Sequence, residues 1–104
     1  PTVTVRDLQE ARQTKAPHFL LDVREPAQYA VGRIEGSKLI PLGELESRLS
    51  ELPRDQRILV HCKLGGRSAK AVGLLRQHGF NDAWNVAGGI TAWSKEIDPS
   101  VAVG

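Results

Sequence analysis

Cysteine, histidine and aromatic residues are scarce in this sequence, and each shortage excludes a class of protein. The 104 residues include one cysteine, no methionine and only 5% aromatic residues. A single cysteine excludes an internal disulfide framework and a cysteine-rich zinc site. The three histidines, His18, His61 and His78, lack the spacing of metal ligands. We therefore expect neither a metal nor another cofactor.

The net charge is also small, at +2. Nucleic-acid-binding domains carry a concentrated basic face and aromatics that stack on bases, so nucleic acid is not an expected partner. No apolar run approaches the ~20 residues that cross a bilayer, and no signal peptide is visible. We expect a cytoplasmic protein without a membrane partner. The slight positive excess favours a small anionic substrate.

The length predicts one domain, residues 1–104, with a single core. Its hydrophobic content of 40% and charged content of 25% are those of a soluble globular protein. The chain begins at Pro1 without a methionine. This beginning fits a processed chain or a domain excised from a longer protein.

Apolar runs and helical patterns alternate along the chain. Strands are predicted at 19–23, 38–40, 58–61 and 83–86, with Val3 in a further short strand, and helices at 5–13, 27–31, 42–52, 67–78 and 90–97. Residues 100–104 are expected to be a frayed tail. Alternation with short connections predicts an α/β fold, with a central mostly parallel sheet of about five strands and helices on both faces.

Two of these helices have additional signals. Thr4 and Asp7 form the pattern of a capping box, which marks the start of the first helix. Four leucines recur at helical spacing and predict one buried stripe, closed by a proline: Leu42, Leu45, Leu49, Leu52 and Pro53.

The most informative stretch runs from Ile58 to Val72. An apolar strand ends at His61, a loop with two glycines and two cations follows, and a helix begins near Arg67. In parallel sheets, ligands bind beyond the carboxyl ends of the strands, where loop amides and a helix N-terminus attract anions. The only cysteine, Cys62, is the first residue of this loop.

Cys62 is therefore the candidate nucleophile. A free thiol titrates near pH ~8.5, and its thiolate is the reactive form. Converging N–H groups, the helix N-terminus, Lys63 and Arg67 are expected to lower the pKa of this thiol. A buried structural cysteine is the alternative, but the loop around it favours catalysis. The expected substrate-binding residues are Lys63, Leu64, Gly65, Gly66, Arg67 and Ser68.

Asp22, Arg24 and Glu25 are predicted to support the site from a neighbouring strand end. Asp22 interrupts a buried strand, where a carboxylate is costly unless it is paired. Arg24 can pair with it, and we favour a structural role for Asp22 over a catalytic one. Arg67 has two open roles: it binds the anionic substrate, or it braces the loop through Glu25 or Asp22. His61 is a poor general base, because neighbours on a strand point to opposite faces.

These residues resemble the rhodanese domain family over nearly the whole chain. The matching blocks are 20–26 with Tyr29, 32–37, 40–42, the loop 62–68, Gly79-Phe80 and 88–93. The loop and the ending from Trp93 to Pro99 are similar to the C-terminal rhodanese domains of molybdopterin-synthase adenylyltransferase/sulfurtransferase proteins.

The resemblance implies a sulfurtransferase. Cys62 would take a sulfane sulfur from thiosulfate or a persulfide donor and pass it, as a persulfide, to a nucleophilic acceptor. That acceptor is cyanide in vitro. In the adenylyltransferase setting it is a ubiquitin-like sulfur carrier, used in molybdopterin, thiamine or cysteine synthesis.

Two other interpretations remain open. Cysteine phosphatases and arsenate reductases of rhodanese fold use the same amide-bound thiolate, but their arginine lies six residues after the cysteine. Here Ser68 occupies that position and Arg67 precedes it. The second alternative is a regulatory binding module or a passive persulfide carrier. The presence of Cys62 argues against a regulatory module, but not against a persulfide carrier.

Overall fold

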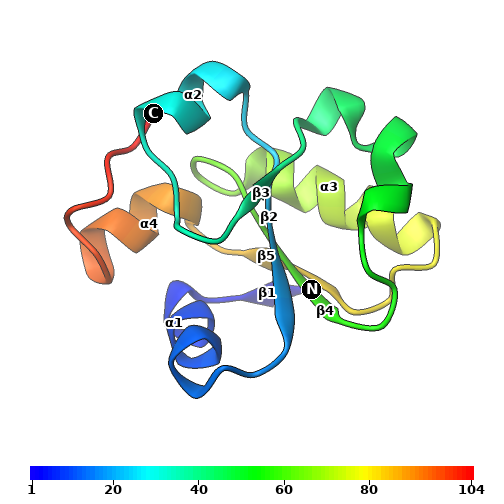
Figure 1. Ribbon diagram of the computed structural model, residues 1–104, viewed down its shortest axis with the longest axis horizontal. Coiled ribbons are helices and arrows are strands. Elements are labelled where there is room, and N and C mark those ends of the chain that lie inside the picture. Colours follow the sequence, from blue (N-terminus) through cyan, green and yellow to red (C-terminus); the bar gives the residue numbers. More distant parts are fainter.

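Strands and helices alternate along the chain in the computed structural model, which describes residues 1–104 (Figure 1). The strands are β1 (Thr2–Val3), β2 (His18–Asp22), β3 (Lys38–Leu39), β4 (Arg57–His61) and β5 (Ala83–Val86). The α-helices are α1 (Val5–Thr14), α2 (Pro26–Val31), α3 (Gly66–Gln77) and α4 (Gly89–Glu96). Two 3₁₀ helices, η1 (Leu42–Glu44) and η2 (Glu46–Glu51), connect β3 to β4.

The strands form one sheet in the order β1-β5-β4-β2-β3, and every pairing is parallel. This confirms the predicted five-stranded α/β sheet. At the carboxyl end of the central pair, Asp22 of β2 lies opposite His61 of β4. The loops after these two strands therefore leave the same edge of the sheet, where a site was expected.

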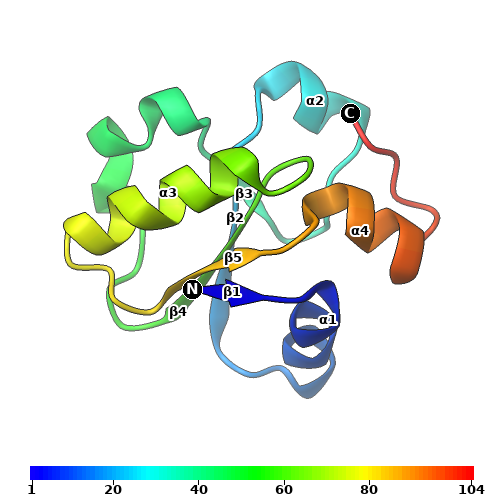
Figure 2. The same cartoon turned by 180° about the vertical axis from the view of Figure 1, so that it is seen from behind.

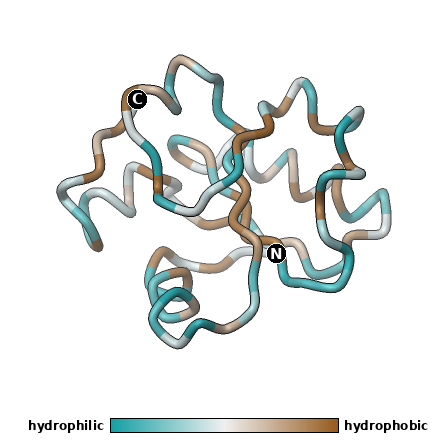
Figure 3. Tube along the Cα trace, viewed as in Figure 1, coloured by the Kyte–Doolittle hydropathy of each residue, from teal (hydrophilic) through white to brown (hydrophobic).

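Helices lie on both faces of the sheet (Figures 1 and 2), and a hydrophobic cluster lies between each face and the helices that cover it. Leu21 and Val60 face α3 and the 3₁₀ segments, whereas Leu20 and Leu59 face α1 and α4. Successive strand residues point to opposite faces, so a strand covered on both sides must be apolar throughout. The hydropathy colouring shows this as a brown centre along the strands (Figure 3).

The capping box is confirmed at the start of α1. The Asp7 N–H donates to the Thr4 hydroxyl over 3.1 Å, and the Thr4 N–H donates to the Asp7 carboxylate over 2.8 Å. The remaining predicted boundaries of helices and strands agree with the structure to within two residues, apart from the leucine-rich segment. None of the helices combines the length and apolar character needed to cross a bilayer.

The prediction of a single helix over 42–52 is wrong. The segment forms two 3₁₀ helices, η1 and η2, and η2 has a kink at Arg48, whose backbone is not helical (φ −122°, ψ 20°). The leucines still face the core, because each pair, Leu42 with Leu45 and Leu49 with Leu52, is three residues apart. Three residues make one turn of a 3₁₀ helix, so the same stripe is compatible with that tighter geometry.

The expectation of a frayed tail is also wrong. Val101 and Val103 pack against the cluster formed by α1, α4 and the sheet. The Ser94 hydroxyl donates to the Val101 carbonyl over 2.7 Å. The last residues run alongside α2 (Figures 1 and 2), and alternating valines make this docking favourable because they leave water on one side.

Candidate active site

Cys62 lies directly after β4, at the carboxyl edge of the sheet. The loop that it begins is fastened to the start of α4: Ile90 donates its N–H to the Cys62 carbonyl over 2.9 Å, and Thr91 donates to the Lys63 carbonyl over 3.1 Å. With these carbonyls directed at α4, the following amides of the loop are free to face the sulfur. The N-terminus of a helix can donate hydrogen bonds to such a sulfur, because its first N–H groups lack partners within the helix.

Two glycines make this arrangement possible. At Gly89 a Cβ atom would overlap the carbonyl oxygens of Cys62 and Lys63. At Gly65 the φ of 126° lies in a region that residues with a side chain rarely adopt. Gly65 turns the chain into α3 and directs its N–H at the Cys62 sulfur over 3.0 Å.

The sulfur lies at the floor of a shallow pocket. Only 3% of Cys62 is exposed, and it contributes to the core cluster between the sheet and α3. Yet its Sγ contacts the Gly65 N–H and, at 3.3 Å, the Ser68 hydroxyl. The pocket above it has a volume of about 320 Å³ and is lined by Arg24, Gln28, Cys62, Lys63, Leu64, Gly66 and Arg67.

These contacts lower the pKa of the Cys62 thiol. Burial raises it, but hydrogen bonds from the Ser68 hydroxyl and from the backbone N–H groups of Ser68, Gly65 and Leu64 outweigh burial. All of these stabilise the thiolate directly. Lys63 and Arg67, also expected to contribute, are exposed side chains at the rim of the pocket. Their position suits attraction of an anion from solvent.

The residues predicted as one loop have distinct positions. Ser68 is fully buried beside the sulfur, whereas Gly66 opens α3 and lines the pocket. Leu64 is the most exposed large apolar side chain of the protein, at 65%. An exposed leucine beside a buried thiol places an apolar contact at the entrance of the pocket.

Sequence reasoning missed Asn85, which connects two parts of this loop. The Ser68 hydroxyl donates to Asn85 Oδ1 over 2.6 Å, and Asn85 Nδ2 donates to the Gly65 carbonyl over 3.3 Å. Asn85 lies on β5, within a strand that the pattern predicted. A polar amide in such a strand was the available signal, but only the sheet order brings it next to Ser68.

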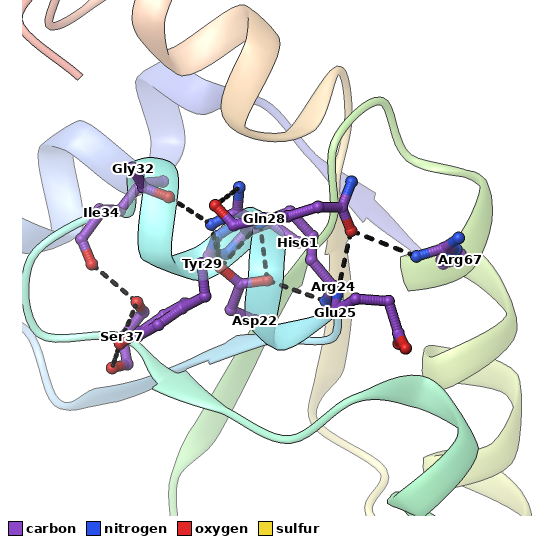
Figure 4. A network of polar contacts seen from close by, with 10 residues as sticks. All are labelled: Asp22, Arg24, Glu25, Gln28, Tyr29, Gly32, Ile34, Ser37, His61 and Arg67. Atoms are coloured by element: carbon purple, nitrogen blue, oxygen red, sulfur yellow. Dashed lines mark hydrogen bonds and ion pairs between the residues drawn. The ribbon is translucent and has the colours of Figure 1, made fainter. Parts of the chain in front are cut away.

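Asp22 and Arg24 form a buried ion pair (Figure 4), and Arg24 also lines the pocket. Both side chains have no exposed area, and their closest atoms, Arg24 Nη2 and Asp22 Oδ2, are 2.8 Å apart. His61 Nε2 lies 3.2 Å from the same carboxylate oxygen, without the alignment of a hydrogen bond. The predicted pairing of Asp22 with Arg24 is present, and His61 points to this cluster.

The surrounding residues lower the pKa of the Asp22 carboxyl group. Burial raises its pKa, but contacts from His61 and Arg24 outweigh burial and lower the pKa to about 2. Arg24 also donates to the backbone carbonyls of Gln28 and Gly32, over 3.4 Å and 2.7 Å. One buried guanidinium thereby connects the end of β2 to a carbonyl within α2 and to the residue that follows this helix.

Arg67 does not brace the loop through an acid. Its hydrogen bond goes to the side-chain oxygen of Gln28 over 3.4 Å, while Asp22 is occupied by Arg24 and His61 (Figure 4). Glu25 is exposed and gives its backbone N–H to the same oxygen of Gln28, over 3.0 Å. The long contact with Gln28 leaves the Arg67 guanidinium available at the pocket.

No group of three or more histidine, cysteine, aspartate or glutamate side chains is arranged to hold a metal ion. The chemistry that this arrangement supports is nucleophilic. It provides a thiol with a lowered pKa, amide donors that favour negative charge on sulfur, and two cations at the entrance.

Comparison with known proteins places this geometry in context. The probable adenylyltransferase/sulfurtransferase MoeZ of Mycobacterium tuberculosis is 36% identical over 104 residues, which are 98% of this chain and 26% of MoeZ. A sulfurtransferase of Allochromatium vinosum is 37% identical over 84 residues, covering 81% of this chain and 78% of that protein. This chain thus spans about a quarter of the adenylyltransferase/sulfurtransferase proteins that it matches.

A solved structure agrees over the full length. The rhodanese-related protein of Thermoplasma volcanium superposes with a TM-score of 0.86 at 37% identity, covering 99% of this chain and 98% of that one. The family model described as the rhodanese-like domain matches residues 4–96, from the N-cap of α1 to the end of α4. This protein therefore belongs to the rhodanese-like domain family.

Proposed function

We propose that this protein is a sulfurtransferase that carries a sulfane sulfur on Cys62 as a persulfide. The observation that carries the proposal is the Cys62 thiol, held by the Gly65 N–H at 3.0 Å on the floor of a pocket that Lys63 and Arg67 border. Relatives named sulfurtransferases support the same reaction class.

In the loading step, the Cys62 thiolate attacks the outer sulfur of thiosulfate. A new sulfur–sulfur bond forms on Cys62 while the bond of the donor breaks, and sulfite leaves with the electron pair. The products are a persulfide anion and a sulfite dianion. The loop amides stabilise negative charge near Sγ, and Lys63 and Arg67 favour the approach of the anionic donor.

In the transfer step, a nucleophile attacks the outer sulfur of the persulfide, and the Cys62 thiolate is the leaving group. Cyanide as acceptor gives thiocyanate and regenerates the enzyme. Neither step needs a general base once the thiol has ionised. His61 contacts Asp22, which is consistent with a mechanism that does not use this histidine as a general base.

Intact-mass spectrometry tests the proposal directly. Incubation with thiosulfate is expected to add the mass of one sulfur atom, and cyanide is expected to remove it. Cys62→Ser is the control, because it deletes the only cysteine. An unchanged mass after incubation, or an adduct retained by Cys62→Ser, contradicts the proposal. Loading without transfer to cyanide would instead indicate a passive persulfide carrier.

A phosphatase assay separates the main alternative. Ser68, the sixth residue after the cysteine, lies 3.3 Å from the sulfur, where the phosphatase pattern has its arginine. We therefore expect no hydrolysis of p-nitrophenyl phosphate by a preparation that loads sulfur from thiosulfate. Hydrolysis that disappears in Cys62→Ser would favour the phosphatase interpretation.

We further propose that the physiological acceptor is a ubiquitin-like sulfur carrier in the cytoplasm, activated by an adenylyltransferase domain. The proteins named adenylyltransferase and sulfurtransferase support this partner. In the test, the persulfide of the loaded protein attacks the carbonyl carbon of an adenylated carrier and AMP leaves, which gives an acyl disulfide. A thiol reductant added afterwards cleaves the sulfur–sulfur bond, and the released thiocarboxylate is measured by mass. No thiocarboxylate, with transfer to cyanide intact, would remove this acceptor and leave the sulfurtransferase reaction standing.

A further inference from the structure

Three side chains form a continuous hydrogen-bonded row from the sulfur to β5. Cys62 Sγ lies 3.3 Å from Ser68 Oγ, and Ser68 Oγ lies 2.6 Å from Asn85 Oδ1. Ser68 has no exposed surface, and Asn85 is half-buried. Solvent is therefore not available to complete the hydrogen bonds of the Ser68 hydroxyl. Its hydrogen bonds must be made with the Cys62 sulfur and the Asn85 amide.

The orientation of Asn85 fixes the proton of Ser68. The Gly65 carbonyl can only accept a hydrogen bond, so the amide nitrogen of Asn85 must face it, at 3.3 Å. The amide oxygen then faces Ser68, and it too can only accept. A hydroxyl has a single proton. In this arrangement Ser68 donates that proton to Asn85.

The contact with sulfur must then change when Cys62 ionises. In the thiol form, the S–H group donates to the Ser68 oxygen, and all three side chains are satisfied. When the thiol proton leaves to solvent, the thiolate needs a donor. Ser68 can supply one only if its proton turns away from Asn85 Oδ1 towards Sγ, because the two acceptors compete for it.

We propose that Asn85 is a positioning residue that sets the thiolate fraction of Cys62 by competing with the sulfur for the single proton of Ser68. Asn85 touches neither the sulfur nor a substrate in this role. It acts through Ser68 and holds the Gly65 carbonyl at the same time. The proposal concerns the ionisation of the thiol, so it can be tested without any sulfur transfer.

The charged and titratable groups around the sulfur come from several elements and are not changed in this test. Arg24 from the end of β2, Lys63 from the loop and Arg67 from α3 line the pocket. His61, the residue before the cysteine, contacts Asp22 on the neighbouring strand. Substitutions at Asn85 and Ser68 leave all five side chains in place.

The experiment measures the rate of iodoacetamide alkylation against pH, with and without Ser68→Ala, in the parent protein and in the variants Asn85→Asp and Asn85→Ala. Asn85→Asp keeps the shape and strengthens the competing acceptor, but it also removes the donor to the Gly65 carbonyl and adds a negative charge near the sulfur. Its midpoint is therefore expected at higher pH and its rate at pH 7 about tenfold lower, and only the comparison with Ser68→Ala isolates the part due to the hydroxyl. Asn85→Ala removes the competitor. The factor by which Ser68→Ala lowers the alkylation rate is then expected to be largest in the Asn85→Ala background, smaller in the parent and smallest in the Asn85→Asp background.

Matched variants separate this coupling from general effects. Asn81→Asp introduces the same charge at an exposed position and is expected to leave the profile unchanged. Ser50→Ala removes an exposed hydroxyl and is expected to have no effect in any background. Melting curves establish that each variant folds. If Asn85→Asp does not fold, the comparison of the parent with Asn85→Ala alone suffices.

The double-mutant cycle gives the deciding result. If Ser68→Ala slows alkylation by the same factor whichever residue occupies position 85, Asn85 does not act through the hydroxyl and the proposal is overturned. A cycle with the expected order supports it even if the protein fails to load sulfur from thiosulfate. Failure of the proposed function and failure of this inference are thus distinguishable.

Discussion

The backbone N–H of Ile90 donates a hydrogen bond to the carbonyl of Cys62 over 2.9 Å, which attaches the first turn of α4 to the reactive loop. The two segments are far apart in sequence, and the close approach depends on Gly89, where a side chain would overlap the loop carbonyls. We therefore expect the reactivity of the thiol to depend on a helix that contributes no side chain to the pocket.

We expect Gly89→Ala to destabilise the protein and to slow sulfur loading. Its φ of +56° costs an alanine about 1–2 kcal/mol, and the overlap with the Cys62 and Lys63 carbonyls adds to this. Gly73→Ala is the matched control, because nothing lies near its Cβ position within α3. That variant is expected to raise the free energy of unfolding by about 0.5–1 kcal/mol. Urea titration measures both, and equal effects would contradict the packing argument.

The Cys62 thiol is expected to react with iodoacetamide well below the pH at which a free cysteine does. Its pKa is lowered because hydrogen bonds from the Ser68 hydroxyl and the loop amides outweigh the opposing effect of burial. The rate should rise with the thiolate fraction and level off before pH ~8.5, the value of a free thiol. Urea-unfolded protein is the control, in which the same cysteine should titrate near the free value. Coincident curves would remove the role of the loop.

Asp22→Asn is expected to lower the free energy of unfolding by about 3–5 kcal/mol, because it leaves a buried guanidinium without its partner. Asp55→Asn, at an exposed position, is the control and should have little effect. Urea titration of the two variants at neutral pH measures the difference. Similar stability of both variants would show that Arg24 finds other partners.

Acid should weaken the fold through the same carboxylate. The pKa of Asp22 is about 2 in the folded protein and about 3.9 in an unfolded chain. A lowered folded pKa means that the unfolded chain binds the proton first, so the contribution is complete above pH ~4 and is lost as the pH falls towards 2. Unfolding free energies measured across this window should fall more steeply for the parent protein than for Asp22→Asn. Parallel slopes would assign the acid sensitivity to other groups.

Arg67→Ala is expected to slow loading from thiosulfate about tenfold at low ionic strength, without a loss of folded protein, because the guanidinium lies at the pocket and its only hydrogen bond is a long one to Gln28. Lys70→Ala removes an equal charge from an exposed position on α3 outside the pocket. Added salt should reduce the difference between parent and Arg67→Ala, since screening weakens attraction of the donor. Parent-like kinetics of Arg67→Ala would exclude Arg67 from donor binding.

Much of this protein could be predicted from local patterns in its sequence. The apolar runs of β2 and β4 indicated strands covered on both faces, and their residues do alternate between two clusters. The glycine-rich loop after β4 indicated where a thiol would meet amide donors, and Gly65 supplies one. These features are local, because strand periodicity, capping and glycine conformations depend on residues within a few positions of each other.

Only the tertiary structure decided the contacts between distant segments. Asn85 reaches Ser68 because β5 lies beside β4 in the sheet, and Ile90 reaches Cys62 because α4 starts at the same edge. The geometry of 42–52 also depended on the fold, since one leucine stripe is compatible with two helix types. Sequence alone determined that a cysteine would stand at a strand end before a helix. The donors that lower the pKa of its thiol, on Leu64, Gly65 and Ser68, are also local. The partners that hold this loop in place, Asn85 and Ile90, are brought there by the fold, which no local pattern records.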